Sequence, residues 1–241
     1  MKIKINNVSV SIGGVPTVFG ASLSVSSGEV ALIMGPNGSG KSSLLSALME
    51  HPRFEIAGGE MFMDEENITG LSAYEKATRG IFFSLQNLPA ISGVSLSKLI
   101  IESARALGRE VASPLQFRNE VAARAKEFGL PEELLSRTVH EKLSGGEKKQ
   151  MEVIQMLALK PKIAILDEID SGTDVDVQKK IARVIATLRA EGTGFLIVSH
   201  HAGFAQMLAP KKVYLMKDGK IVREGDAKLI NEITEKGFEE T

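Results

Sequence analysis

The stretch Gly35-Pro36-Asn37-Gly38-Ser39-Gly40-Lys41-Ser42 decides how the rest of this 241-residue chain is interpreted. Two glycines, then lysine and a hydroxyl side chain, form the pattern of a phosphate-binding loop, because glycines let backbone N–H groups converge on phosphate oxygens. Lys41 is expected to reach the β- and γ-phosphates of a nucleoside triphosphate, and the Ser42 hydroxyl to ligate Mg²⁺. The residues predicted to hold the nucleotide here are Gly35, Pro36, Asn37, Gly38, Ser39, Gly40, Lys41, Ser42 and Ser43.

The sequence on either side of this loop supports the interpretation. Val30–Met34 is a short apolar run without polar alternation, which is typical of a strand buried on both faces. Residues 42–49 have a helical pattern, and the N-terminus of a helix favours a bound anion. The alternative is a glycine-rich turn that matches by chance, and the order of strand, loop and helix disfavours it.

Two adjacent carboxylates end a second apolar run, Ile163-Ala164-Ile165-Leu166-Asp167-Glu168. Asp167 is placed to hold Mg²⁺ through its water shell, which would complete the metal site begun by Ser42. Glu168 is then the group expected to orient or deprotonate the attacking water. An ordinary pair of acids at the end of a strand is the alternative, and the phosphate-binding loop makes it the weaker one.

The segment Leu143-Ser144-Gly145-Gly146-Glu147 precedes a helical stretch at 148–159. Ser144 and Glu147 have the spacing of a capping box, in which each side chain satisfies a backbone N–H group of the first helical turn. The serine hydroxyl and the bare glycine backbone could also face an anion. Capping is the expected role, and a second role at the nucleotide stays open at this point.

Composition narrows the class of protein. Hydrophobic residues make up 43% of the chain and charged residues 24%, with a net charge of -1, so no broad attraction to nucleic acid is expected. The absence of cysteine excludes disulfides, thiolate metal sites and cysteine nucleophiles. No apolar run approaches the ~20 residues that cross a bilayer, and the first residues lack the features of a signal peptide. We therefore expect a cytoplasmic protein that does not insert into a membrane directly.

Hydrophobic periodicity indicates an α/β domain interrupted by helices. Residues 2–25 look like a small antiparallel β-meander. Asp218-Gly219 indicates a hairpin turn between the two last strands. The remaining predicted strands are 163–166, 195–198, 212–216 and 220–223, and the predicted helices are 96–107, 115–128, 131–136 and 175–191.

The phosphate loop, Leu143–Glu147 and the strand ending at Glu168 occur in the order and spacing of the ATP-binding-cassette ATPases, which this chain resembles. The resemblance implies a P-loop ABC ATPase fold with a RecA-like core, an N-terminal antiparallel β-subdomain and an inserted helical subdomain. It also implies ATP and Mg²⁺ as cofactors and one domain over residues 1–241. Within that domain, about 1–86 and 160–241 would form the catalytic core, and about 87–159 the helical subdomain.

The resemblance further implies a head-to-tail dimer, in which Ser144, Gly145 and Gly146 of one copy cap the γ-phosphate held by the other. Gln86 matches the glutamine that senses Mg²⁺ and water. His200 matches the switch histidine at the γ-phosphate, and Asp174 matches an aspartate that crosses the dimer. The catalytic set is then Lys41, Gln86, Glu168 and His200, and the metal set is Ser42, Gln86 and Asp167. The histidines His51, His140 and His201 gain no such support and are expected to be surface or packing residues.

Three features resemble the SufC-like ATPases of iron–sulfur cluster assembly. They are Asp167-Glu168-Ile169-Asp170-Ser171-Gly172, where transport cassettes commonly read Asp-Glu-Pro, then Ser144-Gly145-Gly146-Glu147-Lys148-Lys149, and the ending with Gly225-Asp226 and Gly237-Phe238. Thr173, Gln150 and Ser43 depart from the expected leucine, arginine and threonine. The resemblance implies SufB- and SufD-type scaffold partners that bind near 88–117.

Other functions share part of this evidence. The nucleotide-binding subunit of a membrane transporter would carry the same catalytic residues and would differ in its partner. A chromosome-maintenance cassette would carry a coiled coil or a zinc insertion, which this chain lacks. A further hypothesis concerns Lys149, which could pair with Glu168 before nucleotide binds; a solvated surface lysine is the alternative.

Overall fold

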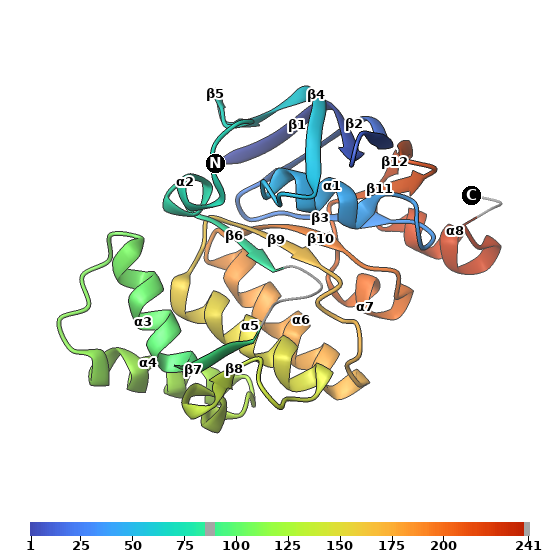
Figure 1. The fold of residues 1–241 in the computed structure, drawn as a ribbon. Coiled ribbons are helices and arrows are strands. Elements are labelled where there is room, and N and C mark those ends of the chain that lie inside the picture. Colours follow the sequence, from blue (N-terminus) through green and yellow to red (C-terminus); the bar gives the residue numbers. More distant parts are fainter. Residues whose placement is uncertain (85–89, 239–241) are drawn as a thin grey trace.

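The computed structural model describes residues 1–84 and 90–238. A six-stranded sheet forms the centre of the fold, in the order β12-β11-β3-β10-β9-β6 (Figure 1). Its strands are β3 (Val30–Met34), β6 (Ile81–Ser84), β9 (Ile163–Asp167), β10 (Gly194–Val198), β11 (Lys212–Lys217) and β12 (Lys220–Gly225). All pairs are parallel except β11 with β12, which is the predicted hairpin. β3, β9 and β10 are buried along their whole length, as their continuous apolar runs predict.

The register of the parallel strands places the site. Val198 of β10 lies opposite Ile33 of β3 on one side and Asp167 of β9 on the other. The carboxyl ends of these three strands therefore meet at one edge of the sheet, where ligands bind in open α/β folds. The phosphate loop, the two carboxylates and the segment that begins at Ser199 are thereby brought to the same edge.

A second, four-stranded antiparallel sheet covers one face of the central sheet (Figure 1). Its order is β2-β1-β4-β5, from β1 (Lys2–Ile12), β2 (Val15–Ser26), β4 (Phe54–Met63) and β5 (Glu66–Asn67). The predicted meander at 2–25 is confirmed as the β1–β2 hairpin, whereas the contribution of residues 54–67 was not predicted. Apolar side chains of both sheets and of α1 (Lys41–Leu48) form one core between them.

Helices cover the other face of the central sheet and enclose a second core. They are α3 (Leu96–Ala106), α4 (Pro114–Glu127), α5 (Gly145–Leu159), α6 (Val175–Ala190), α7 (Ala202–Met207) and α8 (Lys228–Lys236). The stretch predicted as a helix at 131–136 is a short 3-10 helix, Glu132–Ser136, and a two-stranded ladder joins β7 (Ile91–Ser95) to β8 (Thr138–Val139). The subdomain boundaries given above stay a prediction.

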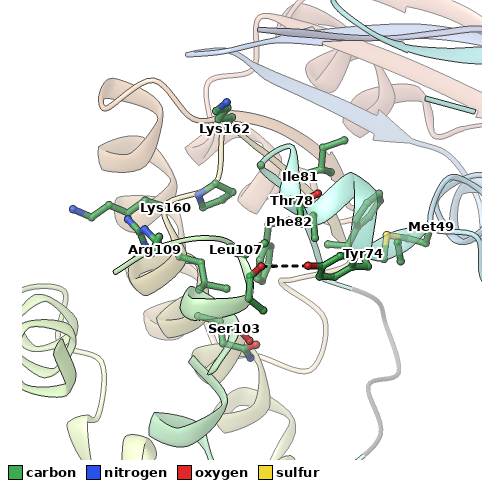
Figure 2. Close-up of a pocket in the computed structure, with 18 residues that line it drawn as sticks. Met49, Tyr74, Thr78, Ile81, Phe82, Ser103, Leu107, Arg109, Lys160 and Lys162 are labelled. Carbon is green, nitrogen blue, oxygen red and sulfur yellow. Dashed lines mark hydrogen bonds between the residues drawn. The ribbon is translucent and has the colours of Figure 1, made fainter. Parts of the chain in front are cut away.

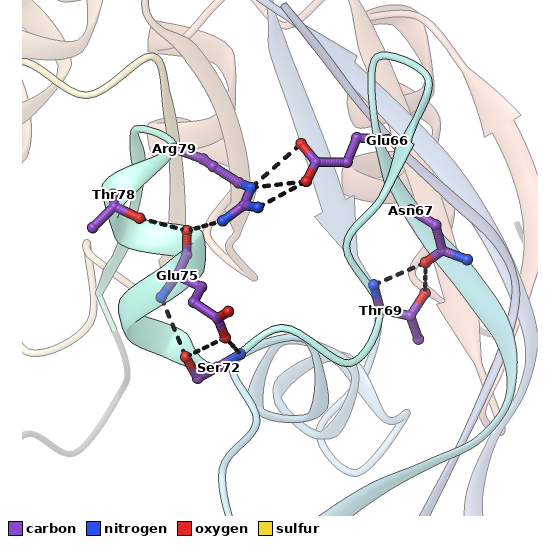
Figure 3. A network of polar contacts seen from close by, with 7 residues as sticks. All are labelled: Glu66, Asn67, Thr69, Ser72, Glu75, Thr78 and Arg79. Carbon is purple, nitrogen blue, oxygen red and sulfur yellow. Dashed lines mark hydrogen bonds and ion pairs between the residues drawn. The ribbon is translucent and has the colours of Figure 1, made fainter.

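Helix α2 (Ala73–Thr78) connects the antiparallel sheet to β6. Ser72 and Glu75 form a capping box at its start, and Arg79 at its end pairs with Glu66 of β5 at 2.8 Å (Figure 3). The Lys76 side chain is buried, and its ammonium donates to the carbonyl of Leu48 at 2.9 Å, at the end of α1. A cation there complements the negative end of a helix dipole, so Lys76 fixes α2 against the helix that follows the phosphate loop.

Among the described residues, no helix has both the length and the apolar character required to cross a bilayer.

Candidate active site

The phosphate-binding loop lies between β3 and α1. Gly35 is required by a close approach, since a Cβ atom at this residue would lie 2.1 Å from the carbonyl oxygen of Met216 in β11. Helix α1 begins at Lys41 and has no side chain that caps its N-terminus. Its first N–H groups are therefore available to an anion, in the geometry that the sequence predicts.

Lys41 is buried and bent back over the loop. Its ammonium donates to the carbonyls of Gly35 at 2.9 Å and Pro36 at 2.8 Å. Burial lowers the pKa of Lys41, while the nearby charges of Glu168 and Asp167 act in the opposite direction. An arriving phosphate can replace the two carbonyls as acceptor, and a charge-assisted bond of this kind is stronger than a neutral one.

Ser42 and Asp167 are brought together from positions 125 residues apart. The Ser42 hydroxyl donates to the Asp167 carboxylate at 3.2 Å, and Asp167 is 1% exposed. Burial raises the pKa of Asp167 to about 6, and the Ser42 hydrogen bond lowers it in part. A hydroxyl and a carboxylate fit Mg²⁺, which takes few protein oxygens and completes its shell with water and substrate phosphates. This hydroxyl–carboxylate pair is the metal-site candidate because its oxygen donors suit Mg²⁺. The described residues contain no cluster of three or more His, Cys, Asp or Glu side chains suited to a metal.

Glu168 and His200 also face each other. His200 Nδ1 lies 3.4 Å from Glu168 Oε1, within ion-pair range. The backbone of Glu168 is left-handed, with a φ of 52°, and this conformation costs about 1–3 kcal/mol for a residue other than glycine. Two hydrogen bonds hold the turn, from Glu168 N–H to Val198 and from Ser171 N–H to Glu168, each at 3.0 Å.

A buried carboxylate next to this pair was missed by the sequence analysis. Asp170 is 0% exposed, and its Oδ2 accepts from the Ser199 hydroxyl at 2.7 Å and lies 2.8 Å from Nδ1 of His201. His201, expected to be a surface or packing residue, has a side chain that is 43% exposed and that also pairs with this carboxylate. The signal available in the sequence was the position of both residues just beyond neighbouring strand ends.

The segment at Ser144–Gly146 lies at the start of α5. Ser144 accepts from the Glu147 N–H at 3.3 Å, and the Glu147 carboxylate accepts from the Ser144 N–H at 2.8 Å, which confirms the capping box. A Cβ atom on Gly145 would lie 3.3 Å from the carbonyl of Gly172, whereas one on Gly146 would meet nothing within 4 Å. The tip of α5 thus packs on the loop after β9 and leaves Gly146 accessible.

Asp174 caps α6, where its carboxylate accepts from the Val177 N–H at 2.8 Å. Asp174, Ser144 and Gly145 are exposed, and in the part of the chain that the structure describes they bond only within their own loops and helix starts. Gln86 lies outside the described residues. Their predicted roles at the nucleotide stay predictions.

Lys149 is buried on the second turn of α5, and its ammonium lies 3.4 Å from the carboxylate of Glu152. The hydroxyl of Ser84, at the end of β6, donates to the same carboxylate. Burial raises the pKa of Glu152 to about 7 against the opposing charge of Lys149. The hypothesis of a solvated Lys149 is therefore wrong, and the proposed pairing with Glu168 stays a prediction.

A groove of about 670 Å³ lies apart from these residues, between the edge of the central sheet and helices α3 and α5 (Figure 2). Aromatic side chains of Tyr74, Phe82 and Phe83 line it, together with the cationic Arg109 and Lys162. The Tyr74 hydroxyl crosses it to the carbonyl of Ala106 at 3.5 Å. The groove overlaps the segment 88–117, which the sequence analysis assigned to a partner.

Comparison with known proteins agrees with the phosphate-binding site described above. Residues 18–171 match the ABC transporter family. A probable ABC transporter ATP-binding protein of Streptococcus pyogenes is 36% identical over 239 residues, which cover 98% of this chain and 93% of that protein.

Two solved structures have the same fold. One is the ADP conformation of an ATP-binding cassette of an ABC transporter, with 26% identity, a TM-score of 0.77 and coverage of 98% and 96% of the two chains. The other, a dimeric bacterial ABC transporter cassette, has 24% identity, a TM-score of 0.79 and coverage of 93% and 98%. The chain therefore belongs to the ABC transporter family, as an ATP-binding subunit that hydrolyses ATP with Mg²⁺ on an α/β P-loop fold.

Proposed function

We propose that this chain is the ATPase subunit of a Suf-type iron–sulfur cluster assembly complex, in which ATP-dependent pairing of two copies changes the shape of SufB- and SufD-type scaffold partners. The observation that carries this proposal is the segment Ile169-Asp170-Ser171-Gly172, where transport cassettes commonly begin with proline. Ile169 and Asp170 are both fully buried, and Asp170 is bonded to two side chains beyond β10. The first two residues of the segment that resembles the SufC-like ATPases are therefore part of the packed core, directly after Glu168.

Within this proposal each side chain has one task. Lys41 leaves its loop carbonyls for the β- and γ-phosphates, while Ser42, Asp167 and Gln86 hold Mg²⁺, which neutralises phosphate charge. Glu168 orients the attacking water and takes its proton, and His200 contacts the γ-phosphate. For that step Glu168 must turn from His200, which now lies 3.4 Å away, towards the water.

The second copy of the chain completes the site. Ser144 and the glycines after it present a hydroxyl and backbone N–H groups at the N-terminus of α5, a geometry suited to an anion. A Cβ atom on Gly146 would meet nothing within 4 Å. Asp174 is exposed and belongs to the same loop as Gly172, whose carbonyl lies against Gly145. These exposed groups support a head-to-tail pairing in which they face the phosphates of the partner copy.

The partner scaffold would bind in the groove between the sheet edge and α3. Its aromatic lining offers apolar contact, and Arg109, Lys160 and Lys162 add positive charge at its rim. An amphipathic segment with apolar and acidic side chains is the occupant that this combination fits best.

The alternative is the nucleotide-binding subunit of a membrane transporter, and the name of the Streptococcus pyogenes relative favours it. The two functions share every catalytic side chain and differ in what binds the groove. Purification of the tagged chain from its own host separates them. The assembly function predicts a detergent-independent complex whose partner binds an iron–sulfur cluster, seen by its visible absorption; an integral membrane protein recovered only in detergent would reject it.

Two variants, one inside the groove and one outside it, test whether the partner binds there. Tyr74 lines the groove and is 62% exposed, while Val222 of β12 is 52% exposed and lies outside both the groove and the segment 88–117. Tyr74→Ala is expected to lose the partner during purification, because aromatic anchors dominate such interfaces. Val222→Ala is expected to keep it. Equal recovery of the partner with both variants would place the binding surface elsewhere.

A further inference from the structure

Two parallel contacts join the loop after β9 to the segment after β10. Glu168 faces His200 at 3.4 Å, and Asp170 faces His201 at 2.8 Å. Residues 168 and 170 belong to one turn, closed by the hydrogen bond from Ser171 N–H to the carbonyl of Glu168. The Glu168–His200 pair, proposed above to be catalytic, and the Asp170–His201 pair are thus two adjacent contacts between the same two segments.

The two pairs differ in contact distance and in the burial of their carboxylates. The Asp170 side chain is 0% exposed and the Glu168 side chain 10%, whereas both histidines are partly exposed, His200 at 30% and His201 at 43%. The Ser199 hydroxyl donates to Asp170 at 2.7 Å and accepts from the backbone N–H of His201 at 3.1 Å. Asp170 Oδ1 has no hydrogen-bond partner among the described residues, so both donors converge on Oδ2. The loss of one donor would leave a buried carboxylate poorly satisfied.

The hydrogen bonds of Asp170 determine which ring nitrogen of His201 carries the hydrogen. A carboxylate oxygen that already accepts the Ser199 hydroxyl can only accept from His201, so Nδ1 of His201 carries the hydrogen. The ring is then fixed in orientation by a buried group. The ring of His200 lies against it, with centroids 4.2 Å apart and planes inclined by 56°.

We propose that His201 is a positioning residue for ATP hydrolysis, which through Asp170 holds the strained turn at Glu168 and the ring of His200 in place. The inference rests on the role proposed above for His200. When nucleotide binds, the Glu168–His200 contact at 3.4 Å is exchanged for contacts with the water and the γ-phosphate. The Asp170–His201 contact at 2.8 Å persists and keeps both segments in register during this exchange.

The test uses three substitutions of His201 in the full chain. The side-chain nitrogen of Asn occupies the position of Nδ1, and that of Gln the position of Nε2, so only His201→Asn preserves the donor to Asp170. His201→Leu is expected to lower kcat on the order of tenfold with the KM for ATP within about twofold, because a small displacement of a reacting group costs rate more than binding. His201→Asn should recover kcat to within about threefold of the original chain, and His201→Gln should not.

A spectroscopic measurement separates positioning from folding. The ¹H–¹⁵N signals of the histidine rings report the Nδ1 hydrogen bond of His201 and the surroundings of His200. Every His201 variant loses the ring current of the imidazole that lies against His200, so the His200 signals are compared among these variants. The signals of His201→Leu and His201→Gln should differ from that of His201→Asn. In Asp170→Asn, which keeps the His201 ring, the His200 signal should move from its position in the original chain. An unchanged kcat in His201→Leu would overturn the proposal, as would equal losses in the Leu, Asn and Gln variants that follow their melting temperatures.

His200→Ala separates the role proposed for His200 from the inference about His201. If this variant hydrolyses ATP normally, the role proposed for His200 fails, and the inference about His201 fails with it. If His200→Ala is inactive while His201→Leu is fully active, only the inference about His201 fails.

Discussion

Lys41 and Ser144 both stand at the start of a helix, yet Lys41 is buried and Ser144 is exposed. Lys41 bonds to its own loop, and the charges of Asp167 at the end of β9 and of Glu168 just after it act on its ammonium. This end of the nucleotide site is therefore assembled by the core of one chain. Within residues 1–84 and 90–238, the Ser144 side chain bonds only to its capping-box partner, at the tip of α5. The comparison teaches that one end of the site is preorganised by packing, whereas the other is a stable helix start that awaits a second surface.

The largest effect is expected at the preorganised end. Lys41→Ala removes the ammonium that would replace two carbonyl contacts by phosphate contacts. We expect ATP affinity to fall about 10- to 100-fold, since a charge-assisted hydrogen bond contributes about 1.5–3 kcal/mol. Titration calorimetry with Mg-ATP measures the change, and Lys179→Ala, at an exposed lysine, is the control. Unchanged affinity would contradict the role of Lys41.

At the exposed end we expect the opposite pattern, in which turnover falls while ATP affinity is kept. Gly146→Asp places a negative charge at the N-terminus of α5, where nothing lies within 4 Å of the added Cβ atom. A charge there favours the helix, so the melting temperature should stay within about 2 °C. Turnover should fall at least about tenfold, because the same charge repels the γ-phosphate of a partner copy. ATP affinity of the single chain should not change.

Gly146→Ala is the matched control for that substitution, since it adds volume without charge. It should keep most of the turnover. If Gly146→Asp hydrolyses ATP as fast as Gly146→Ala does, the tip of α5 does not meet a phosphate, and the comparison between the two ends loses its functional meaning.

A smaller effect is expected where α5 is buried. The pKa of Glu152 is raised from 4.5 to about 7 by burial, so the folded chain binds its proton more tightly than the unfolded chain does. Stability from this group is therefore present at low pH and is lost as pH rises towards 7, by about 1 kcal/mol between pH 6 and 8. Glu152→Gln should remove this part of the dependence, which denaturant unfolding at the two pH values measures. Parallel pH curves for the two proteins would contradict it.

The preorganised end was largely predictable from the sequence. The loop 35–42, the buried run of β3 and the carboxylate Asp167 each carry a local signal, and the parallel register brings Ser42 to Asp167. Continuous apolar runs predict buried parallel strands because both of their faces are covered, here by helices on one side and by the antiparallel sheet with α1 on the other. The order of the strands in the sheet depends on which strands pair with each other, and local sequence patterns do not encode that pairing.

The pairs around Glu168 were less predictable. Asp170 and His201 are separated by 31 positions, and their contact depends on β9 and β10 being neighbours in the sheet. The left-handed backbone of Glu168 also has no local signal, because it is held by a hydrogen bond to Val198 in the adjacent strand. Likewise, Gly58-Gly59 interrupts the alternating pattern of β4, and β5 has only two residues. Both strands join their sheet through pairing, β4 with β1 and β5 with β4.

The most direct test of the two-ended site is the mass of Glu168→Gln with Mg-ATP in solution. The substitution removes the proposed base but leaves Lys41, Ser42 and Ser144 intact, so ATP should bind, persist and hold two copies together. Light scattering after gel filtration should then give twice the 25.9 kDa mass of the chain, and Glu168→Gln combined with Gly146→Asp should give the single-chain mass. A single-chain mass for Glu168→Gln with ATP bound would contradict the account.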